Sequence, residues 1–425
     1  MTGRREAITP ERTRGRARVW RCAQAVTVVV VALLVTVVPG IPDAAAGSDD
    51  IAAPTTAIPA GSFDGVDYVQ YDGVFAGRTS TGVFRVPYRI TAPGDPEDGN
   101  GGVVVEPPHF ATGLGSLAFQ LGRKFLLGRR FIHAGVGYST TSFGPGLDQR
   151  ILDPTVPSTY IDGGFADGNG RTDDEIVADF ARALATDADA HAMVGEVRDT
   201  YLTGFSDAAG VPLRLVASGQ ADGVFELVIP FTVESPVDPQ AALGAGRFDG
   251  KLLIVNSAAE DSSNLVDSGA HPDQYRFHAV AGTPHVSDPL VPLFSNQTTP
   301  ASWIPALRAH FLQAHRWVRN GVVPPPSSSV DDGPRLPFVK LGEAGFHSGF
   351  LGSYDNVKTI TQLGFATHRA YAKAFNDAVD AYARAGSILP GEASEMMRRA
   401  SLCPPLTYTE TYRDHYGRFV ALTPC

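Results

Sequence analysis

The sequence predicts an α/β protein with a mainly parallel sheet, helices on both sides of it, loop or cap insertions and a C-terminal helical extension. Two observations carry this prediction. Short, nearly continuous apolar runs recur along the chain, as expected of parallel strands buried on both faces. Helix-like segments lie between several of these runs, and such alternation is typical of a parallel sheet. The 425 residues, 43% of them hydrophobic, are enough to bury a large core.

Seven segments have the composition of strands. In chain order they are GVFRVPYRIT (82–91), GGVVVE (101–106), FIHAGVGYS (131–139), TYLTG (200–204), ELVIPFTV (226–233), KLLIVN (251–256) and RFHAVAG (276–282). The first alternates apolar and polar residues like a half-buried antiparallel strand, whereas most of the others read as buried parallel strands.

Five segments have the character of helices. They are residues 114–127, 173–197, the stretch after Ser206, 301–321, and a late helix that carries Tyr371, Phe375, Val379 and Tyr382 on one face and ends at Gly386. Thr172 is a possible N-cap for the second of them, and acidic residues follow in its first turn. Gly321 ends the fourth.

The N-terminus has the pattern of a secretory signal peptide over residues 1–46. Seven arginines precede an uncharged run at about 23–38, and the small residues Ala44, Ala45 and Ala46 follow. An uncleaved membrane anchor is the alternative, but the run is shorter than the ~20 apolar residues that a spanning helix needs. We therefore expect cleavage after Ala46, a secreted or cell-envelope location, and no stable membrane insertion afterwards.

The rest of the chain reads as one catalytic domain with a lead-in. Residues 47–62 are small, polar and Pro-containing, which predicts a flexible lead-in to a single domain over 63–425. Within this domain, residues 322–335 have the composition of a linker-like loop, and residues 336–425 form the helical extension.

Charge and cysteine content limit the partners of the chain. Removing residues 1–46 takes seven of 35 basic and three of 45 acidic residues, which leaves a net charge near −14. Such an acidic body argues against nucleic acid as a partner. Cys403 and Cys425 remain as a pair, for which an oxidising compartment favours a disulfide over two free thiols. Their spacing does not suggest zinc.

The segment TYLTGFSDAA carries the central motif. An apolar strand runs into Gly204-Phe205-Ser206-Asp207-Ala208 and then into a helical stretch, which is the pattern of a nucleophile elbow in the form G-x-S-x-A. Small neighbours let strand and helix approach each other around the strained serine. A tight turn with a capping serine is the alternative. If the elbow is present, the backbone N–H of Asp207 can donate to an oxyanion.

Residues after two later strands strengthen the interpretation of the elbow. A serine hydroxyl needs a base, and the base needs an orienting carboxylate; in the α/β-hydrolase fold they follow in the order serine, acid, histidine, each after a strand. Glu260 and Asp261 follow the strand KLLIVN, and His285 follows RFHAVAG. We expect Ser206 as nucleophile, His285 as base and Glu260 as acid, with Asp261 as second choice.

A second oxyanion donor is expected from the loop after GGVVVE. Pro107 and Pro108 have no N–H to donate, so His109 or Phe110 is the candidate. Ser139, in GYSTT, is a rival nucleophile, although its surroundings lack a convincing helix directly behind it.

Several segments together resemble a family of exported bacterial α/β hydrolase domain proteins. The matching pieces are GGVVVEPPHF, FIHAGVGYSTTSFG, LTGFSDAA, FDGKLLIVNSAAED, YRFHAVAGTPH, RWVRNGVVPPPSS and AFNDAVDAYARAGSILP. The resemblance implies a serine nucleophile at Ser206 and a catalytic histidine at His285. Members usually carry a glutamate and an aspartate two apart in the acid loop; here Ala258 fills the first place and Glu260 the second.

These features predict hydrolysis of a small-molecule carboxylic ester through an acyl-enzyme, without a metal or an organic cofactor. An amidase or peptidase with the same residues, and a non-catalytic exported binding protein on the same scaffold, are the alternatives. The sequence does not specify the oligomeric state.

Overall fold

The computed structural model describes residues 50–80, 82–109, 117–138, 174–260, 263–286, 299 and 301–401. All of them belong to one unit of the chain, residues 46–425. The predicted signal peptide and the pair Cys403 and Cys425 lie outside the described residues.

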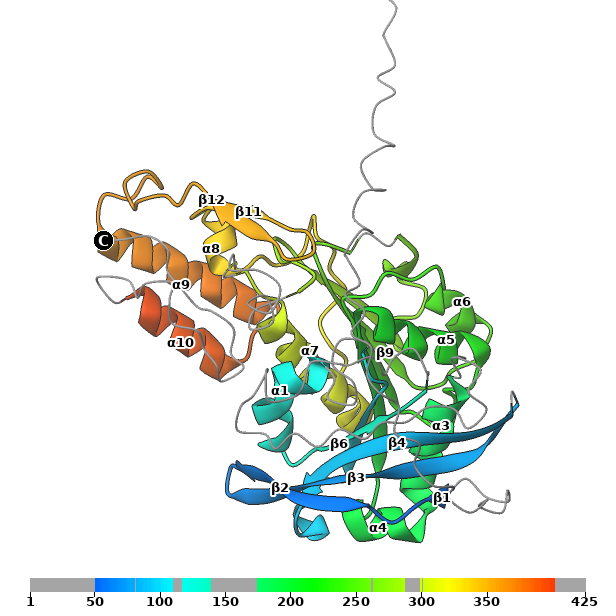
Figure 1. Ribbon diagram of the computed structural model, residues 1–425. Helices are drawn as coiled ribbons and strands as arrows, with labels where there is room; N and C mark the ends of the chain where they lie inside the picture. The colour runs from blue at the N-terminus through cyan, green and yellow to red at the C-terminus, as the bar shows by residue number, and fades with distance from the viewer. Residues whose placement is uncertain are drawn as a thin grey trace, which may run out of the picture. The chain divides into compact units, whose positions relative to one another are not determined.

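One sheet of ten strands organises this unit (Figure 1). Its strand order is β1-β3-β4-β6-β5-β7-β8-β9-β10, with β2 paired to β3. The strands are β1 (Asp50–Ile51), β2 (Thr56–Phe63), β3 (Val66–Thr79), β4 (Gly82–Pro93), β5 (Gly102–Glu106), β6 (Ile132–Val136), β7 (Asp199–Phe205), β8 (Leu227–Phe231), β9 (Lys251–Ser257) and β10 (Tyr275–Val280). A separate hairpin joins β11 (Gly345–His347) to β12 (Ser353–Asp355).

Helices connect most of the parallel strands. They are α1 (Leu117–Leu127), α3 (Glu175–Thr186), α4 (Ala188–Val194), α5 (Gly210–Ser218), α6 (Pro239–Gly244), α7 (Ile304–Asn320), α8 (Pro337–Lys340), α9 (His368–Arg384) and α10 (Pro390–Ala400), with short 3-10 turns η1 (Pro96–Asp98), η2 (Ser206–Ala209) and η3 (Ser263–Leu265). The helix expected over 173–197 is divided because the Asp187 side chain accepts a hydrogen bond from the N–H of Ala190 and begins α4.

The strands β5 to β10 pair parallel with one another, and β4 joins β6 antiparallel. Every residue of β5, β6, β7, β8 and β10 is buried, which explains their mostly apolar sequences. The predicted fold, with a mainly parallel sheet and an antiparallel strand before it, is therefore confirmed.

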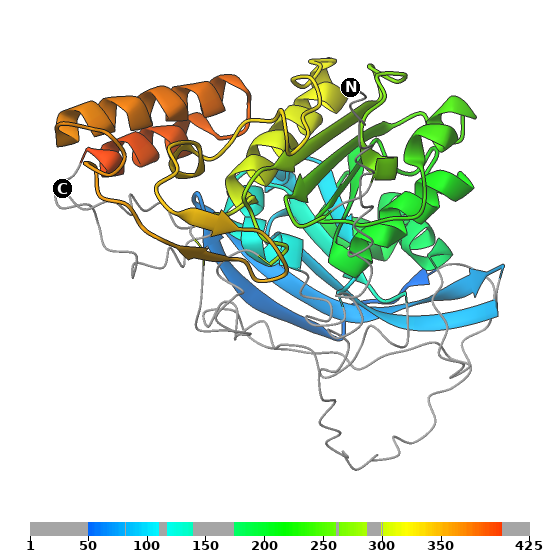
Figure 2. The same cartoon turned by 90° about the horizontal axis from the view of Figure 1, so that it is seen from above.

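The core lies on both faces of this sheet. Because side chains alternate along a strand, Val103 and Val105 of β5 pack with Phe180 of α3, whereas Val104 packs on the other side with Phe311 of α7. Figure 2 shows α3, α5 and α6 on one side of the sheet and α7 on the other. The alternation of strands and helices in the sequence thus covers both faces.

The prediction of a flexible lead-in over residues 47–62 is wrong where strands form in this segment. Residues 56–63 form β2, and Asp50–Ile51 forms β1; both pair antiparallel with β3. The strand β3 itself, Val66–Thr79, was not predicted. Its Gln, Asp and Gly residues interrupt the apolar pattern. The strand is stabilised by its pairing with β4 over Tyr68 to Thr79.

The linker-like loop at 322–335 is likewise more than a spacer. The N–H of Ser328 donates to the carbonyl of Phe277 at 2.8 Å, and the N–H of Ala279 donates to the carbonyl of Ser328 at 2.9 Å. The loop therefore covers the edge strand β10, whose backbone groups would otherwise be unpaired. Beyond it, α9 and α10 pack against each other, as the predicted helical extension requires (Figure 1).

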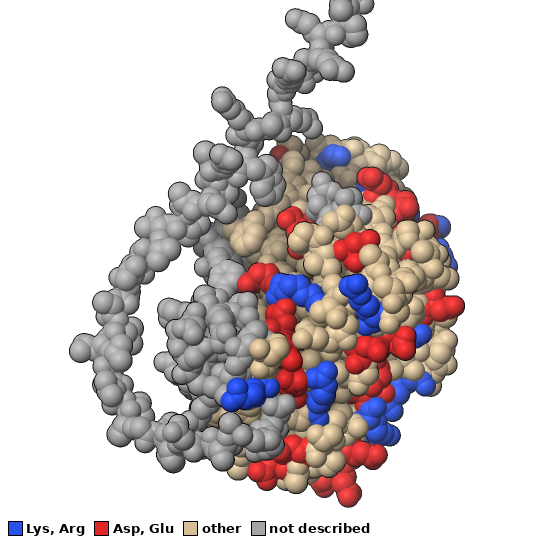
Figure 3. Space-filling model, turned by 90° about the vertical axis from the view of Figure 1, so that its right-hand side faces the viewer, with Lys and Arg blue, Asp and Glu red and all other residues tan. Residues whose placement is uncertain are grey.

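On the face in Figure 3, acidic and basic side chains are interspersed. None of the helices in the described part of the chain is both long enough and apolar enough to cross a membrane.

Candidate active site

The serine lies in a strained turn between β7 and α5. Ser206 has φ of 57°, a left-handed conformation that is rare for a residue other than glycine. Gly204 permits the turn, because a Cβ at this position would lie 2.7 Å from the carbonyl oxygen of Ala208. The strand, the turn η2 and the helix follow one another as the elbow pattern predicts.

Three predicted residues meet in one chain of hydrogen bonds. The Oγ of Ser206 lies 2.8 Å from Nε2 of His285, and Nδ1 of His285 lies 2.6 Å from Oε1 of Glu260. A carboxylate only accepts, so Nδ1 carries the proton toward Glu260 and Nε2 is left to accept from the serine hydroxyl. The three residues come from separate loops after β7, β9 and β10.

Glu260 is fixed through both carboxylate oxygens. Its Oε2 accepts a hydrogen bond of 2.7 Å from the backbone N–H of Ser257, while Oε1 contacts His285. The residue is buried, at 8% exposure, so water competes little for these bonds. Asp261, the second choice for the acid, lies outside the described residues.

Aromatic side chains lie against the imidazole of His285. The ring centroids of Phe205 and Phe350 lie 5.3 Å and 5.2 Å from it. Nε1 of the buried Trp303 donates to the His285 carbonyl at 3.2 Å. Neither Trp303 nor Phe350 was predicted from the sequence, because each reaches the site from a segment distant along the chain.

The two predicted sources of oxyanion donors are joined by their side chains. Nε2 of His109, in the loop after β5, lies 2.8 Å from Oδ1 of Asp207. His109 is buried and its ring also packs near Phe205. This contact ties the loop to the elbow. Phe110 and the rival nucleophile Ser139 lie outside the described residues.

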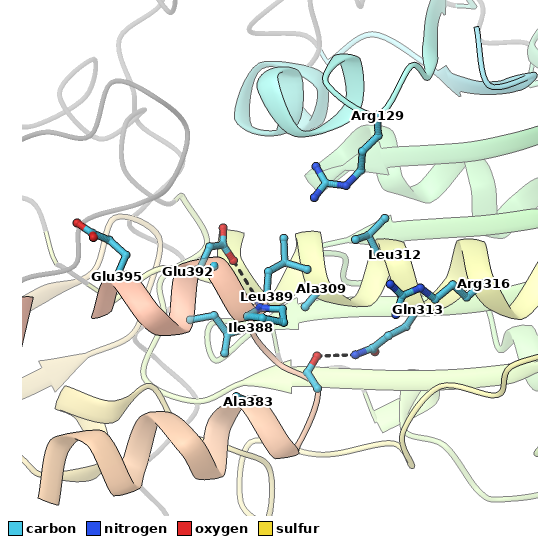
Figure 4. Close-up of a pocket in the computed structure, with 13 residues that line it drawn as sticks. Arg129, Ala309, Leu312, Gln313, Arg316, Ala383, Ile388, Leu389, Glu392 and Glu395 are labelled. Carbon is cyan, nitrogen blue, oxygen red and sulfur yellow. Dashed lines mark hydrogen bonds between the residues drawn. The ribbon is translucent and has the colours of Figure 1, made fainter. Parts of the chain in front are cut away.

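Two cavities lie beside α7. The one in Figure 4, of about 790 Å³, is surrounded by α7, the α9–α10 hairpin and the end of α1. It is lined by Arg129, Ala309, Leu312, Gln313, Arg316, Ala383, Gly386, Ile388, Leu389, Pro390, Gly391, Glu392 and Glu395. The other, of about 30 Å³, lies among residues of the sheet, α1 and α7, including Glu106, Thr203 and Phe231. Neither is lined by Ser206, Glu260 or His285.

In the described residues no group of three or more His, Cys, Asp or Glu side chains is arranged to hold a metal.

Comparison with known proteins identifies the family. Residues 78–349 match the alpha/beta hydrolase domain family, and the chain belongs to it. This confirms the resemblance as far as the alpha/beta hydrolase domain is concerned and supports a hydrolase in general terms. No curated protein matches the chain.

Solved structures with related folds include several hydrolases. The rice cell wall degrading esterase LipA from Xanthomonas oryzae is 12% identical, with 43% of this chain and 50% of that chain covered and a TM-score of 0.27. A CocE/NonD family hydrolase from Staphylococcus aureus is 12% identical, with 54% and 49% covered and a TM-score of 0.33. Est1E from Butyrivibrio proteoclasticus, solved with ferulic acid, is 10% identical, with 55% and 96% covered and a TM-score of 0.34. The chain thus spans about half the length of the first two.

Proposed function

We propose that this chain is a serine hydrolase that cleaves carboxylic esters through an acyl-enzyme on Ser206. The single observation that carries the proposal is the continuous hydrogen-bonded order of Ser206, His285 and Glu260, at 2.8 Å and 2.6 Å. Membership of the alpha/beta hydrolase domain family supports it.

In the first half of the reaction, Oγ of Ser206 attacks the ester carbonyl carbon while Nε2 of His285 takes the hydroxyl proton. Glu260 stabilises the imidazolium that forms and keeps Nε2 directed at the serine. The tetrahedral intermediate then collapses: its C–O bond to the leaving group breaks, and the proton on Nε2 passes to the leaving oxygen. An alcohol departs, and the acyl group remains on Ser206.

In the second half, a water molecule attacks the acyl carbon and His285 takes its proton. Collapse releases the carboxylic acid and returns the proton to Ser206. The oxyanion of both intermediates is assigned to the backbone N–H of Asp207, with His109 or Phe110 as second donor. The contact of 2.8 Å between the side chains of His109 and Asp207 supports this pairing, because it keeps the two backbone segments together.

We also propose that the chain is exported. The basic and apolar pattern of residues 1–46 supports this location, which in turn favours a disulfide between Cys403 and Cys425. N-terminal sequencing of the protein recovered from the producing cells should find a chain that starts at Gly47. A chain that retains its first residues would contradict cleavage.

The experiment that tests the catalytic proposal is labelling with a fluorophosphonate, followed by peptide mass spectrometry. We expect one modified residue, Ser206, and no modification in His285→Ala. Ser206→Ala should lose turnover of esters and keep the fold, as judged by circular dichroism. Absence of labelling beside a control hydrolase would overturn the proposal in favour of a binding role. Faster turnover of matched amides than of esters would replace the ester assignment with an amidase.

A further inference from the structure

One large aromatic side chain is exposed beside the candidate catalytic histidine. Among the described residues, the exposed large hydrophobic side chains are Val266, Val322, Val323, Phe350 and Val357. Phe350 is the most exposed of these, at 61%, and is the only aromatic residue among them. An exposed aromatic ring next to a reactive group is a candidate for ligand contact.

The backbone holds Phe350 in place. It lies between β11 and β12, and this connection pairs with the segment that carries the histidine: the N–H of His285 donates to the carbonyl of Gly349 at 2.9 Å, and the N–H of Val286 donates to the carbonyl of Phe350 at 2.8 Å. Gly352, with φ of 64°, lets the connection approach closely, since a Cβ there would lie 2.8 Å from Cβ of Pro284.

The ring of Phe350 is stacked on the imidazole. The two ring centroids are 5.2 Å apart and the ring planes differ by 18°. Phe205 also contacts the imidazole, at 5.3 Å, but Phe205 is buried at 2% exposure. Phe350 therefore combines contact with His285 and access from solvent.

The position of the Phe350 ring beside His285 places it near one particular part of a bound ester. The leaving oxygen must reach Nε2 of His285, because that nitrogen gives it the proton. The carbonyl oxygen turns instead toward the donors proposed at Asp207 and at His109 or Phe110. A ring stacked on His285 is thus beside the alcohol portion of the substrate and not beside the oxyanion.

We propose that Phe350 is a specificity-determining residue that binds the apolar or aromatic alcohol portion of the ester. The inference rests on the proposed ester hydrolysis. It assigns to the protein a preference for esters of aryl-bearing or other apolar alcohols over esters of small polar alcohols, because the exposed ring loses contact with water when such a group stacks on it.

The test compares two esters with one acyl group and alcohols of similar acidity, benzyl acetate and methyl acetate. In Phe350→Ala, kcat/KM for benzyl acetate relative to methyl acetate should fall by about five- to tenfold. The ratio of benzyl butyrate to benzyl acetate should stay unchanged, because the proposal places only the alcohol portion against this ring. Val357→Ala, which removes another exposed side chain after β12, is the matched control and should leave both ratios unchanged.

A role limited to orienting His285 makes a different prediction. The alcohol has left before the acyl-enzyme reacts with water, so a residue that binds only the alcohol leaves deacylation unchanged. With 4-nitrophenyl acetate, the steady-state rate after the burst measures deacylation when that step is rate-limiting. We expect this rate to be equal in wild type and Phe350→Ala. Slower deacylation with an equal loss on both acetates would overturn the proposal, as would unchanged ratios. If the wild-type protein hydrolyses none of these esters, the failure belongs to the proposed function itself.

Discussion

At the scale of single residues, Glu260, the proposed acid of the candidate triad, has a partner for each of its two carboxylate oxygens. Glu260 bridges the imidazole of His285 and the backbone N–H of Ser257. Because both oxygens are hydrogen-bonded, the carboxylate does not rotate toward water. It therefore favours one tautomer and one orientation of the imidazole. The identity of this acid was left open between Glu260 and Asp261 by the sequence.

Replacing the acid should separate these two residues. Glu260→Gln keeps the shape of the side chain but allows its amide to donate to Nδ1, which favours the wrong tautomer; kcat for ester hydrolysis should fall roughly 10²- to 10⁴-fold with little change in KM. Asp261→Asn is the matched control and should keep kcat within about twofold. Steady-state kinetics on one ester measure both. A larger loss in Asp261→Asn would move the acid to that residue.

At the scale of elements, a buried ion pair connects α7 to α10. Nη1 of Arg308 lies 2.7 Å from Oε1 of Glu392, and both side chains are buried. Burial raises the pKa of Glu392, whereas the nearby Arg308 opposes that rise. The C-terminal helices thus dock on the catalytic unit through a polar contact as well as through their apolar faces.

Removing one member of this pair should destabilise the fold. Glu392→Ala leaves the guanidinium of Arg308 with one fewer buried anionic partner, so the free energy of unfolding in urea should fall by about 3 kcal/mol. Asp377→Ala removes the exposed partner of Lys373 on α9 and should change it by less than about 0.5 kcal/mol. Equal effects of the two substitutions would show that the buried pair adds nothing to the docking of α10.

At the scale of the whole molecule, two buried histidines join the edge of the sheet to α7. The imidazoles of His278, in β10, and His310, in α7, stack with centroids 3.9 Å apart. Burial lowers the pKa of His310 from 6.5 to about 4. Burial, followed by the nearby His310 and Arg276, holds the pKa of His278 well below its usual range.

Burial of the two histidines makes stability dependent on pH in one direction. Above pH 6.5 both the folded and the unfolded chain hold His310 neutral; between 6.5 and about 4 only the unfolded chain takes the proton, so stability falls as pH falls. For His310 alone the loss at pH 4 relative to pH 7 is about 3 kcal/mol.

Urea unfolding at several pH values checks this expectation. His310→Gln removes the titrating group, and its free energy of unfolding should fall less steeply than that of wild type between pH 6.5 and 4. The exposed His191→Gln should keep the wild-type slope. Parallel curves for wild type and His310→Gln would show that the stacked pair does not govern acid stability.

Much of the central sheet was predictable because its signals are local. The apolar runs that became β5 to β10 are buried on both faces, so their composition alone marks them. The strands β2 and β3 were not predicted because Gly61, Gln70 and Asp72 interrupt the apolar pattern. They are stabilised because β2 pairs with β3 and β3 pairs with β4. The short strands β11 and β12, three residues each, have too little length for a period to be read.

The order of residues along the chain determined the elbow at Ser206 and the positions of Glu260 and His285 after two later strands. These are consequences of neighbouring residues: glycine where a turn needs space, apolar runs where strands are buried, polar residues where strands end. The tertiary structure alone decided that Glu260 reaches Nδ1 of His285, that His109 contacts Asp207, and that Phe350 stacks on the imidazole. Those contacts join segments far apart in the chain, and their distances depend on how the whole sheet, its loops and the β11–β12 hairpin pack together.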